Sequence, residues 1–213
     1  MRVELETVTP LFLAGANQRE PELRAPSFRG VMRFWLRALL GGVLGDNPQE
    51  IFKHESAVFG STEHASPVIV RVKDKLKELK VGDYRPLPHN PKKSFTFKGL
   101  TPDQIFTLTL LSRDENALKK AAKALQLLCL LGGLGRRSRR GFGSLQIVNG
   151  DLPKLEVSTT KELSSRLKER LEKITGNKFA SVSSTPSFPI LHPCWAQVRV
   201  YKKEFSTWEE AIR

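Results

Sequence analysis

Residues Gly132 to Leu145 read Gly-Gly-Leu-Gly-Arg-Arg-Ser-Arg-Arg-Gly-Phe-Gly-Ser-Leu. This stretch, called the glycine loop below, holds five glycines and four arginines between an apolar helical run and a short β-like run. Glycine tolerates left-handed backbone angles, so successive N–H groups can point the same way and hold an anion. The alternative is a basic, flexible hairpin loop without a ligand. The arginines favour the anion site, because their forked and permanently charged groups fit phosphate oxygens.

The order of elements around the loop excludes two common nucleotide-binding motifs. A P-loop follows a strand and ends in Lys-Ser/Thr, whereas this loop follows a helical run and contains no lysine. The dinucleotide-binding fingerprint leads from a strand into a helix, but this loop leads into the β-like residues 145–148. We therefore expect no cofactor.

Hydrophobic spacing predicts two helices and four strands in the first 150 residues. Alternation predicts a strand from Val3 to Thr9, and helical spacing runs from residue 28 to 44 after an expected N-cap at Ser27. A second helix follows an expected cap at Asp114 or Ser112. The other expected strands are 68–72, 104–111 and 145–148, with a short connector at 51–60 and a long irregular segment at 73–103. The order β-α-β-β-α-β predicts an α+β domain of the ferredoxin-like (RRM-like) type.

This topology brings three loops to one edge of the predicted sheet. Successive elements alternate in direction, so the loop after the first strand, the connection between the second and third strands, and the glycine loop share that edge. The N-terminus of the first helix lies there as well and adds partial positive charge. We expect this edge to bind a ligand.

Three arginines recur every four residues along the first predicted helix. Arg29, Arg33 and Arg37 therefore stack on one face of it. The alternative is a solvated face with intrahelical salt bridges, but no Asp or Glu lies among them to supply such bridges. We expect this ridge to face an anion.

Composition points to an anionic partner. The 213 residues include 35 basic and 22 acidic side chains, for a net charge of +13 and a pI near 10. Such a balance is typical of proteins that bind nucleic acid or an anionic membrane surface. No apolar run is long enough to span a membrane, and the N-terminus reads as a strand rather than a signal peptide. Two cysteines, Cys129 and Cys194, supply neither a disulfide framework nor a four-ligand zinc site, which favours the cytoplasm and no metal.

The sequence pattern indicates a new region after Val148. The turn signal Asn149-Gly150-Asp151 suggests a boundary, so we predict domains at 1–150 and 151–213. The second region would contain a helix from Lys161 to about Ile174 capped by Thr160, a loop at 180–193, a strand at 195–201 and a helix starting at 206 or 207. We interpret it as a linker helix and the start of a second, partial ferredoxin-like domain.

Several stretches resemble one known family. They are Thr9-Pro10-Leu11-Phe12-Leu13-Ala14-Gly15, Pro21-Glu22-Leu23-Arg24-Ala25-Pro26-Ser27, Arg29-Gly30-Val31-Met32-Arg33-Phe34-Trp35-Leu36-Arg37, Phe59-Gly60-Ser61-Thr62-Glu63 and the glycine loop. They are similar to subunit one of the CRISPR Cmr complex, a family within the RAMP superfamily (repeat-associated mysterious proteins). The resemblance implies paired ferredoxin-like domains and membership of a type III-B effector that cuts RNA matched to a guide. It also implies a place near the 3′ region of the guide, where the subunit helps to engage target RNA.

RAMP relatives include nucleases, but the residues that cut RNA in them have no counterpart here. Guide-processing relatives place a histidine on or near the first helix, and residues 28–44 contain none. Target-cutting relatives use an aspartate after the first strand, where residues 10–27 offer only Glu20 and Glu22. We expect no catalytic residue and interpret the four histidines as structural or solvated: His54, His64, His89 and His192.

We therefore predict a non-catalytic RNA-binding subunit whose partners are guide RNA, target single-stranded RNA and other Cmr-complex proteins, with no membrane partner. Two alternatives stay open, a metal-independent endoribonuclease that leaves a 2′,3′-cyclic phosphate and a scaffold whose basic edge docks onto an acidic subunit. The predicted RNA-binding residues are Arg24, Arg29, Arg33, Arg37, Gly133, Gly135, Arg136, Arg137, Arg139, Arg140, Gly141 and Gly143.

Overall fold

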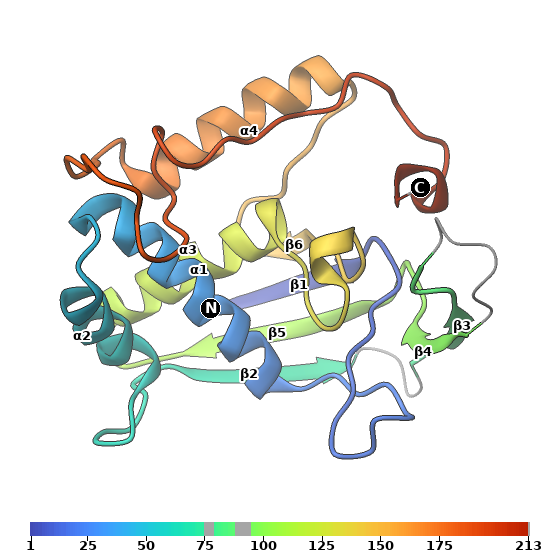
Figure 1. Ribbon diagram of the computed structural model, residues 1–213. Coiled ribbons are helices and arrows are strands. Elements are labelled where there is room, and N and C mark those ends of the chain that lie inside the picture. Colours follow the sequence, from blue (N-terminus) through green and yellow to red (C-terminus); the bar gives the residue numbers. More distant parts are fainter. Residues whose placement is uncertain (75–78, 88–94, 213) are drawn as a thin grey trace.

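A four-stranded antiparallel sheet in the order β2-β5-β1-β6 forms the centre of the computed structural model, which describes residues 1–74, 79–87 and 95–212. Its strands are β1 (Arg2–Thr7), β2 (Ile69–Asp74), β5 (Ile105–Leu111) and β6 (Leu145–Gly150). Two helices, α1 (Ala25–Leu44) and α3 (Glu115–Leu131), lie across one face of this sheet (Figure 1). The predicted α+β class is confirmed, and these elements follow one another along the chain in the predicted order.

The hydrophobic core lies between this sheet and the two helices. Alternation along β1 buries Val3 and Leu5 and leaves Glu4 and Glu6 on the side away from the core. Both helices bury residues at three- and four-residue spacing, which places them on one helical face. The buried helical residues of this core include Phe28, Met32 and Leu36 from α1 and Ala117, Ala121, Leu125 and Leu128 from α3.

One helix begins where the sequence predicted and the other begins earlier. The carboxylate of Asp114 caps α3 by accepting hydrogen bonds from the amides of Asn116 and Ala117. In contrast, α1 begins at Ala25 with Arg24 as N-cap, so the expected cap at Ser27 was wrong. Proline is tolerated in a first helical turn because its missing N–H would have no intrahelical partner there. Pro26, which the expected cap at Ser27 placed before the helix, is therefore part of it.

The segment predicted as a connector at 51–60 is a helix, α2 (Pro48–Phe59), so that prediction was wrong. The side chain of Asn47 caps it by accepting a hydrogen bond from the amide of Glu50. The buried face of α2 includes a carboxylate, Glu55, beside Ile51 and Val58. A charged residue on the buried face breaks the hydrophobic spacing from which a helix is predicted.

The segment predicted as irregular at 73–103 contains a small hairpin. Its strands β3 (Val81–Tyr84) and β4 (Phe97–Leu100) pair antiparallel and form a second sheet. A bridge between Leu11 and Leu100 joins this hairpin to the loop after β1. The two lysines at 92–93 lie outside the described residues. Strands this short carry too few alternating positions to stand out in a sequence.

After residue 148 the structure departs from the sequence interpretation in three places. β6 continues through the expected turn to Gly150, which pairs with Val3. The helix α4 (Thr160–Thr175) is capped by Thr159 rather than Thr160. The strand expected at 195–201 is not formed, although α5 (Trp208–Ile212) begins next to the expected position. An alternating pattern becomes a strand only beside a partner, and within the described residues no strand lies along this segment.

Among the described residues, no helix is both long and apolar enough to cross a membrane.

Candidate nucleic-acid interface

The glycine loop and the loop after β1 meet at one edge of the large sheet, as predicted. The amide of Gly143 donates to the carbonyl of Pro10 at 2.9 Å, and the amide of Arg136 donates to the carbonyl of Phe12 at 2.8 Å. The β3–β4 hairpin reaches the same edge through the pairing of Leu11 with Leu100 (Figure 1). Three segments that are distant in sequence therefore build one surface.

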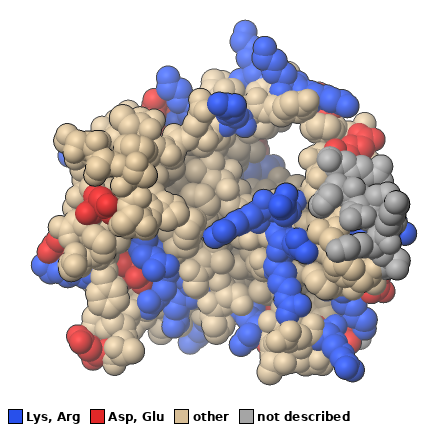
Figure 2. Space-filling view, in the orientation of Figure 1, with Lys and Arg blue, Asp and Glu red and all other residues tan. Residues whose placement is uncertain are grey.

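The four arginines of the glycine loop present their charge on this surface. Arg136, Arg139 and Arg140 are exposed and Arg137 is half-buried. Figure 2 shows a stripe of basic side chains over the loop that continues toward the loop after β1. No ion pair between these arginines and a described carboxylate is present. The charge of this group, called the loop arginines below, is therefore not neutralised within the described part of the chain.

The backbone of the glycine loop uses part of its hydrogen-bonding capacity within the fold. Gly135, Gly141 and Gly143 do adopt positive φ angles, of 83°, 85° and 67°. However, several loop amides already donate to carbonyls of the chain, and these are the amides of residues 134, 136, 140, 141 and 143. Gly133 serves close packing, because a Cβ there would lie 2.9 Å from the carbonyl oxygen of Phe142. The loop thus offers its guanidinium side chains together with the amides of residues 137–139, which donate to no described backbone carbonyl.

The three arginines of α1 lie in different environments. Arg37 is exposed, whereas Arg29 is half-buried and its Nε has no hydrogen-bond partner among the described residues. Arg33 pairs with Glu55 of α2 at 2.9 Å and donates to the carbonyls of Phe59 and Gly60 at 2.6 and 2.5 Å. We expected this ridge to face an anion and to lack intrahelical salt bridges, and Arg33 instead pairs with an acid of the neighbouring helix. The sequence interpretation looked for partners within one helix and read α2 as a connector.

The partner of Arg33 is a buried carboxylate. The residue Glu55 is 2% exposed, and burial raises its pKa because it disfavours the charged form. The positive charges of Arg33 and Arg37 act in the opposite direction without cancelling that effect. The ion pair therefore compensates a buried charge, which gives Arg33 a role in holding α1 against α2.

Arg24 organises the loop between β1 and α1. As the N-cap residue of α1, it lies where the loop enters the helix. Its Nη1 donates to the carbonyl of Ala14 at 3.5 Å, and its Nε lies 3.9 Å from the carboxylate of Glu22. Arg24 and Glu22 therefore pair locally within this loop.

A cavity of about 500 Å³ adjoins Arg136, and the sequence interpretation missed it. Nη2 of Arg136 donates to Oε1 of Gln18 at 2.7 Å, and its guanidinium carbon lies 5.8 Å from the centre of the Phe97 ring. The sequence hinted at this cavity only through Phe95 and Phe97, which alternate with polar residues. In the folded hairpin the ring of Phe97 lies next to Arg136 and lines the cavity. The lining comes from three separate segments: Phe12, Leu13, Ala14, Gln18, Arg19, Glu20, Asp83, Thr96, Phe97, Lys98 and Arg136.

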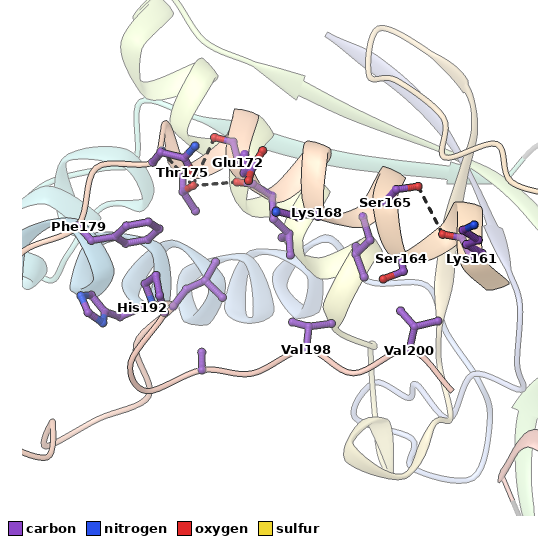
Figure 3. A pocket seen from close by; sticks show the side chains of 16 residues that line it. Lys161, Ser164, Ser165, Lys168, Glu172, Thr175, Phe179, His192, Val198 and Val200 are labelled. Carbon is purple, nitrogen blue, oxygen red and sulfur yellow. Dashed lines mark hydrogen bonds between the residues drawn. The ribbon is translucent and has the colours of Figure 1, made fainter. Parts of the chain in front are cut away.

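A second cavity, of about 590 Å³, lies between α4 and residues 191–200. Figure 3 shows Val198 and Val200 across from the helix, where Thr175 and Glu172 hydrogen-bond along α4. Its lining is mainly apolar and includes no residue of the glycine loop. Residues from the unformed strand expected at 195–201 line one wall of this cavity: Ala196, Val198 and Val200.

Each of the three described histidines lies within reach of a hydrogen-bonding or acidic partner. The ring nitrogens of His64 contact Oγ of Ser61 and the carbonyl of Ser56, both at 3.0 Å. His192 is buried, with one ring nitrogen 3.0 Å from the carbonyl of Ala180 and the other bonded to the amide of Cys194. His54 is half-exposed beside an acid of α2, and His89 lies outside the described residues. Within the described ranges, no group of three or more potential metal ligands gathers.

Comparisons with known proteins identify the family of this chain. Residues 4–146 match the model of the RAMP superfamily. The chain is 33% identical over 175 residues to the CRISPR system Cmr subunit Cmr1-2 of Pyrococcus furiosus, an alignment that covers 68% of this chain and 92% of that protein. It is 35% identical over 230 residues to Cmr1-1 of the same organism, covering 97% of this chain and 67% of that protein.

Solved structures agree with this relationship. The crystal structure of Cmr1 from Pyrococcus furiosus in its apo form superposes with a TM-score of 0.63 at 28% identity. That match covers 88% of this chain, which spans only 62% of the length of the crystallised protein. A chain of the type III-B Cmr-beta complex bound to cognate target RNA, solved by cryo-EM, shares the fold with a TM-score of 0.66 at 17% identity, covering 84% of this chain and 63% of that one. By its sequence match over residues 4–146 and its kinship with Cmr1 proteins, the chain belongs to the RAMP superfamily.

Proposed function

We propose that this chain is a non-catalytic RNA-binding subunit of a type III-B Cmr complex, where it grips phosphates of guide or target RNA. The observation that carries the proposal is the group of loop arginines, exposed or half-buried and without an ion pair to a described carboxylate. Like charges crowded into one loop repel one another, and an anionic partner relieves that repulsion. A sugar–phosphate backbone provides regularly spaced anions for such a group.

Relatives support the assignment to this complex. The two similar proteins from Pyrococcus furiosus are named as Cmr subunits, and the Cmr-beta complex that contains the shared fold is bound to cognate target RNA. The transfer of these partners to the present chain is our inference. It gains weight because the match with Cmr1-1 covers 97% of this chain, including the glycine loop and α1.

The fold supports the same proposal. The strand order β2-β5-β1-β6 with two helices on one face leads us to assign residues 1–150 to a ferredoxin-like unit. We assign residues 151–213 to the start of a second α+β unit. In the first unit the loop arginines lie on a rigid edge rather than on a free tail, because the glycine loop is hydrogen-bonded to the loop after β1.

The arginines predicted to bind RNA differ in how available their guanidinium groups are to phosphate. The loop arginines come first, and the loop glycines hold them in place through left-handed angles and close packing. Arg24, Arg29 and Arg37 would extend the surface along α1 and its N-cap. Arg33 is a structural residue in this proposal, since its guanidinium is already engaged with α2.

The test removes the loop charges and follows binding as a function of salt. Changing Arg136, Arg137, Arg139 and Arg140 together to Ala should weaken binding of single-stranded RNA of any sequence. The slope of log affinity against log salt should also flatten by about 0.7 for each phosphate that the variant no longer neutralises. A matched control changes Lys161, Lys168, Arg170 and Lys173 of α4 to Ala, which removes the same number of charges elsewhere.

Equal affinity of the loop variant and the wild-type protein across the salt titration would refute the assignment, and so would an equal loss of affinity in the α4 control. Failure of the wild-type protein to bind RNA would favour the scaffold alternative. Incubation with end-labelled RNA, with magnesium or with EDTA, should leave the RNA intact, and cleavage would favour the endoribonuclease alternative.

A further inference from the structure

The cavity beside Arg136 has an aromatic floor. The rings of Phe12 and Phe97 pack edge to face, with centroids 5.6 Å apart, and Phe95 extends this cluster to a third ring 5.7 Å from Phe97. Phe12 is buried, whereas Phe97 is half-buried and lines the cavity. The ring of Phe97 is therefore an aromatic surface available at the edge of the proposed RNA-binding face.

A planar cation already lies over this ring. The guanidinium carbon of Arg136 is 5.8 Å from the centroid of Phe97, and the side chain is held in addition by Gln18. Guanidinium groups and nucleobases are both planar and stack on aromatic faces. The position of Arg136 thus marks the face of the Phe97 ring on which a planar group can stack. Arg136 is also one of the loop arginines proposed to contact phosphate.

The rim of the cavity carries both signs of charge. Lys98 pairs with Glu20 at 2.9 Å, and the carboxylate of Asp83 also acts on the Lys98 ammonium. Against these two carboxylates the lining sets three basic side chains, Arg19, Lys98 and Arg136, so its charges nearly balance and suit a neutral group at least as well as an anion. A nucleobase is neutral and offers hydrogen-bond donors and acceptors along its edge, which the carboxylates, the Lys98 ammonium and the Gln18 amide can match.

We propose that this cavity, called the Phe97 cavity below, receives one unpaired nucleobase of the RNA, stacked on Phe97 while Arg136 turns to the adjacent phosphate. The proposal rests on the proposed function and adds a base contact to it. A volume of about 500 Å³ suits a single nucleotide rather than a duplex. Stacking on an aromatic ring tolerates any base, so the contact discriminates single-stranded from paired RNA without reading sequence.

The test separates base contacts from phosphate contacts. We would measure binding of a mixed-sequence single-stranded RNA and of inorganic polyphosphate, which carries the charges but no bases. Phe97→Ala should reduce RNA affinity roughly 10-fold and leave polyphosphate affinity within 2-fold, the reduction being that of one stacked base. Arg136→Ala should weaken both ligands, and Phe97→Tyr should rescue RNA binding because it retains the ring. Phe52→Ala, which removes an exposed ring of α2, is the control and should change neither.

A second measurement is independent of folding effects at Phe97. RNA that contains 4-thiouridine, irradiated in complex with the wild-type protein, should crosslink to the peptide that contains Phe97. Two outcomes would overturn the proposed base contact in the Phe97 cavity: crosslinks confined to other peptides, or an equal loss of affinity for both ligands in Phe97→Ala. Neither outcome would contradict phosphate binding by the loop arginines. Absence of RNA binding by the wild-type protein would instead remove the proposed function and this inference with it.

Discussion

The guanidinium of Arg33 joins two helices. It reaches from α1 to the carboxylate of Glu55 and to the two carbonyls that end α2, those of Phe59 and Gly60. These carbonyls lie at the C-terminus of α2, where backbone acceptors lack intrahelical partners and a cation is favourable. One side chain therefore neutralises a buried acid and caps a helix. Arg37, four residues further along α1, is exposed, and its charge acts on Glu55 more weakly than that of Arg33.

Arg33→Ala should lower the free energy of unfolding by roughly 2–3 kcal/mol at pH 7, because it leaves the Glu55 carboxylate buried without its partner. Arg37→Ala should change it by less than about 0.5 kcal/mol, as is usual for an exposed residue. The pKa of Glu55 is already raised, and loss of Arg33 raises it further. The penalty should therefore shrink as the pH falls from 7 toward this raised pKa, because Glu55 takes up a proton and loses its charge.

Chemical denaturation of the two variants at pH 7 and pH 5 measures this difference. An equal effect of Arg33→Ala and Arg37→Ala, or a penalty for Arg33→Ala that grows as the pH falls, would contradict the structural role of the ion pair.

At the scale of elements, the glycine loop is shaped by close backbone approach. A Cβ at Gly143 would lie 1.9 Å from the carbonyl oxygen of Leu134, and a Cβ at Gly135 would lie 2.4 Å from that of Phe12. Both residues also have positive φ angles. The loop can therefore fold against the loop after β1 only with glycine at these positions, and this packing is what holds the arginines at the edge of the sheet.

Gly143→Ala should destabilise the protein by more than about 2 kcal/mol, because the new methyl group meets a backbone carbonyl and the φ angle is strained. Gly30→Ala is the matched control, since a Cβ at this position of α1 meets nothing within 4 Å. It should stabilise the protein by about 0.5–1 kcal/mol, the usual gain from replacing a helical glycine. Thermal unfolding of both variants decides the point, and a Gly143→Ala protein as stable as the wild type would show that the loop packs differently.

The elements that sequence patterns predicted are those whose apolar spacing is regular. β1 alternates strictly, and α3 combines an Asp114 cap with an unbroken apolar face, so both were placed to within a few residues. α2 was missed because its buried face carries Glu55, whose partner is on another helix. The Phe97 cavity was missed for a similar reason, because its walls come from segments far apart in the sequence. A pattern within one segment cannot report a partner that only the fold supplies.

At the scale of the whole molecule, the chain after β6 is attached to the large sheet unit by apolar contacts and by hydrogen bonds, among them those from the amides of Ala180 and Leu191 to the carbonyls of Gly42 and Ala38. α4 packs through Ile174 against Leu39 and Leu127 of α1 and α3. α5 packs through Trp208, whose ring lies 5.8 Å from Tyr84 of the hairpin and 6.1 Å from Phe142 of the glycine loop. Between these two anchors the chain runs past α4 without forming a strand (Figure 1).

Hydrogen exchange should distinguish the well-paired strands of the sheet from the chain that follows β6. The amides of β1 and β5 are paired on both sides of each strand within the sheet, so peptides from them should exchange slowest. The amides of residues 197–201 have no backbone partner among the described residues, and a peptide covering them should exchange within seconds. α4, with intact helical hydrogen bonds but few buried side chains, should fall between these extremes.

Mass spectrometry of peptides after timed labelling gives this ranking directly, with β6 as the internal reference for a strand paired along one side only. Protection of residues 197–201 equal to that of β6 would contradict the structure and mean that the alternating pattern from Trp195 to Tyr201 does form a paired strand. Rapid exchange of residues 197–201, together with slow exchange in β1 and β5, would agree with the structure. Residues 197–201 would then have the alternating sequence of a strand but no second strand to pair with. Alternation specifies which face of a strand is buried, but the hydrogen bonds of a strand depend on a second strand.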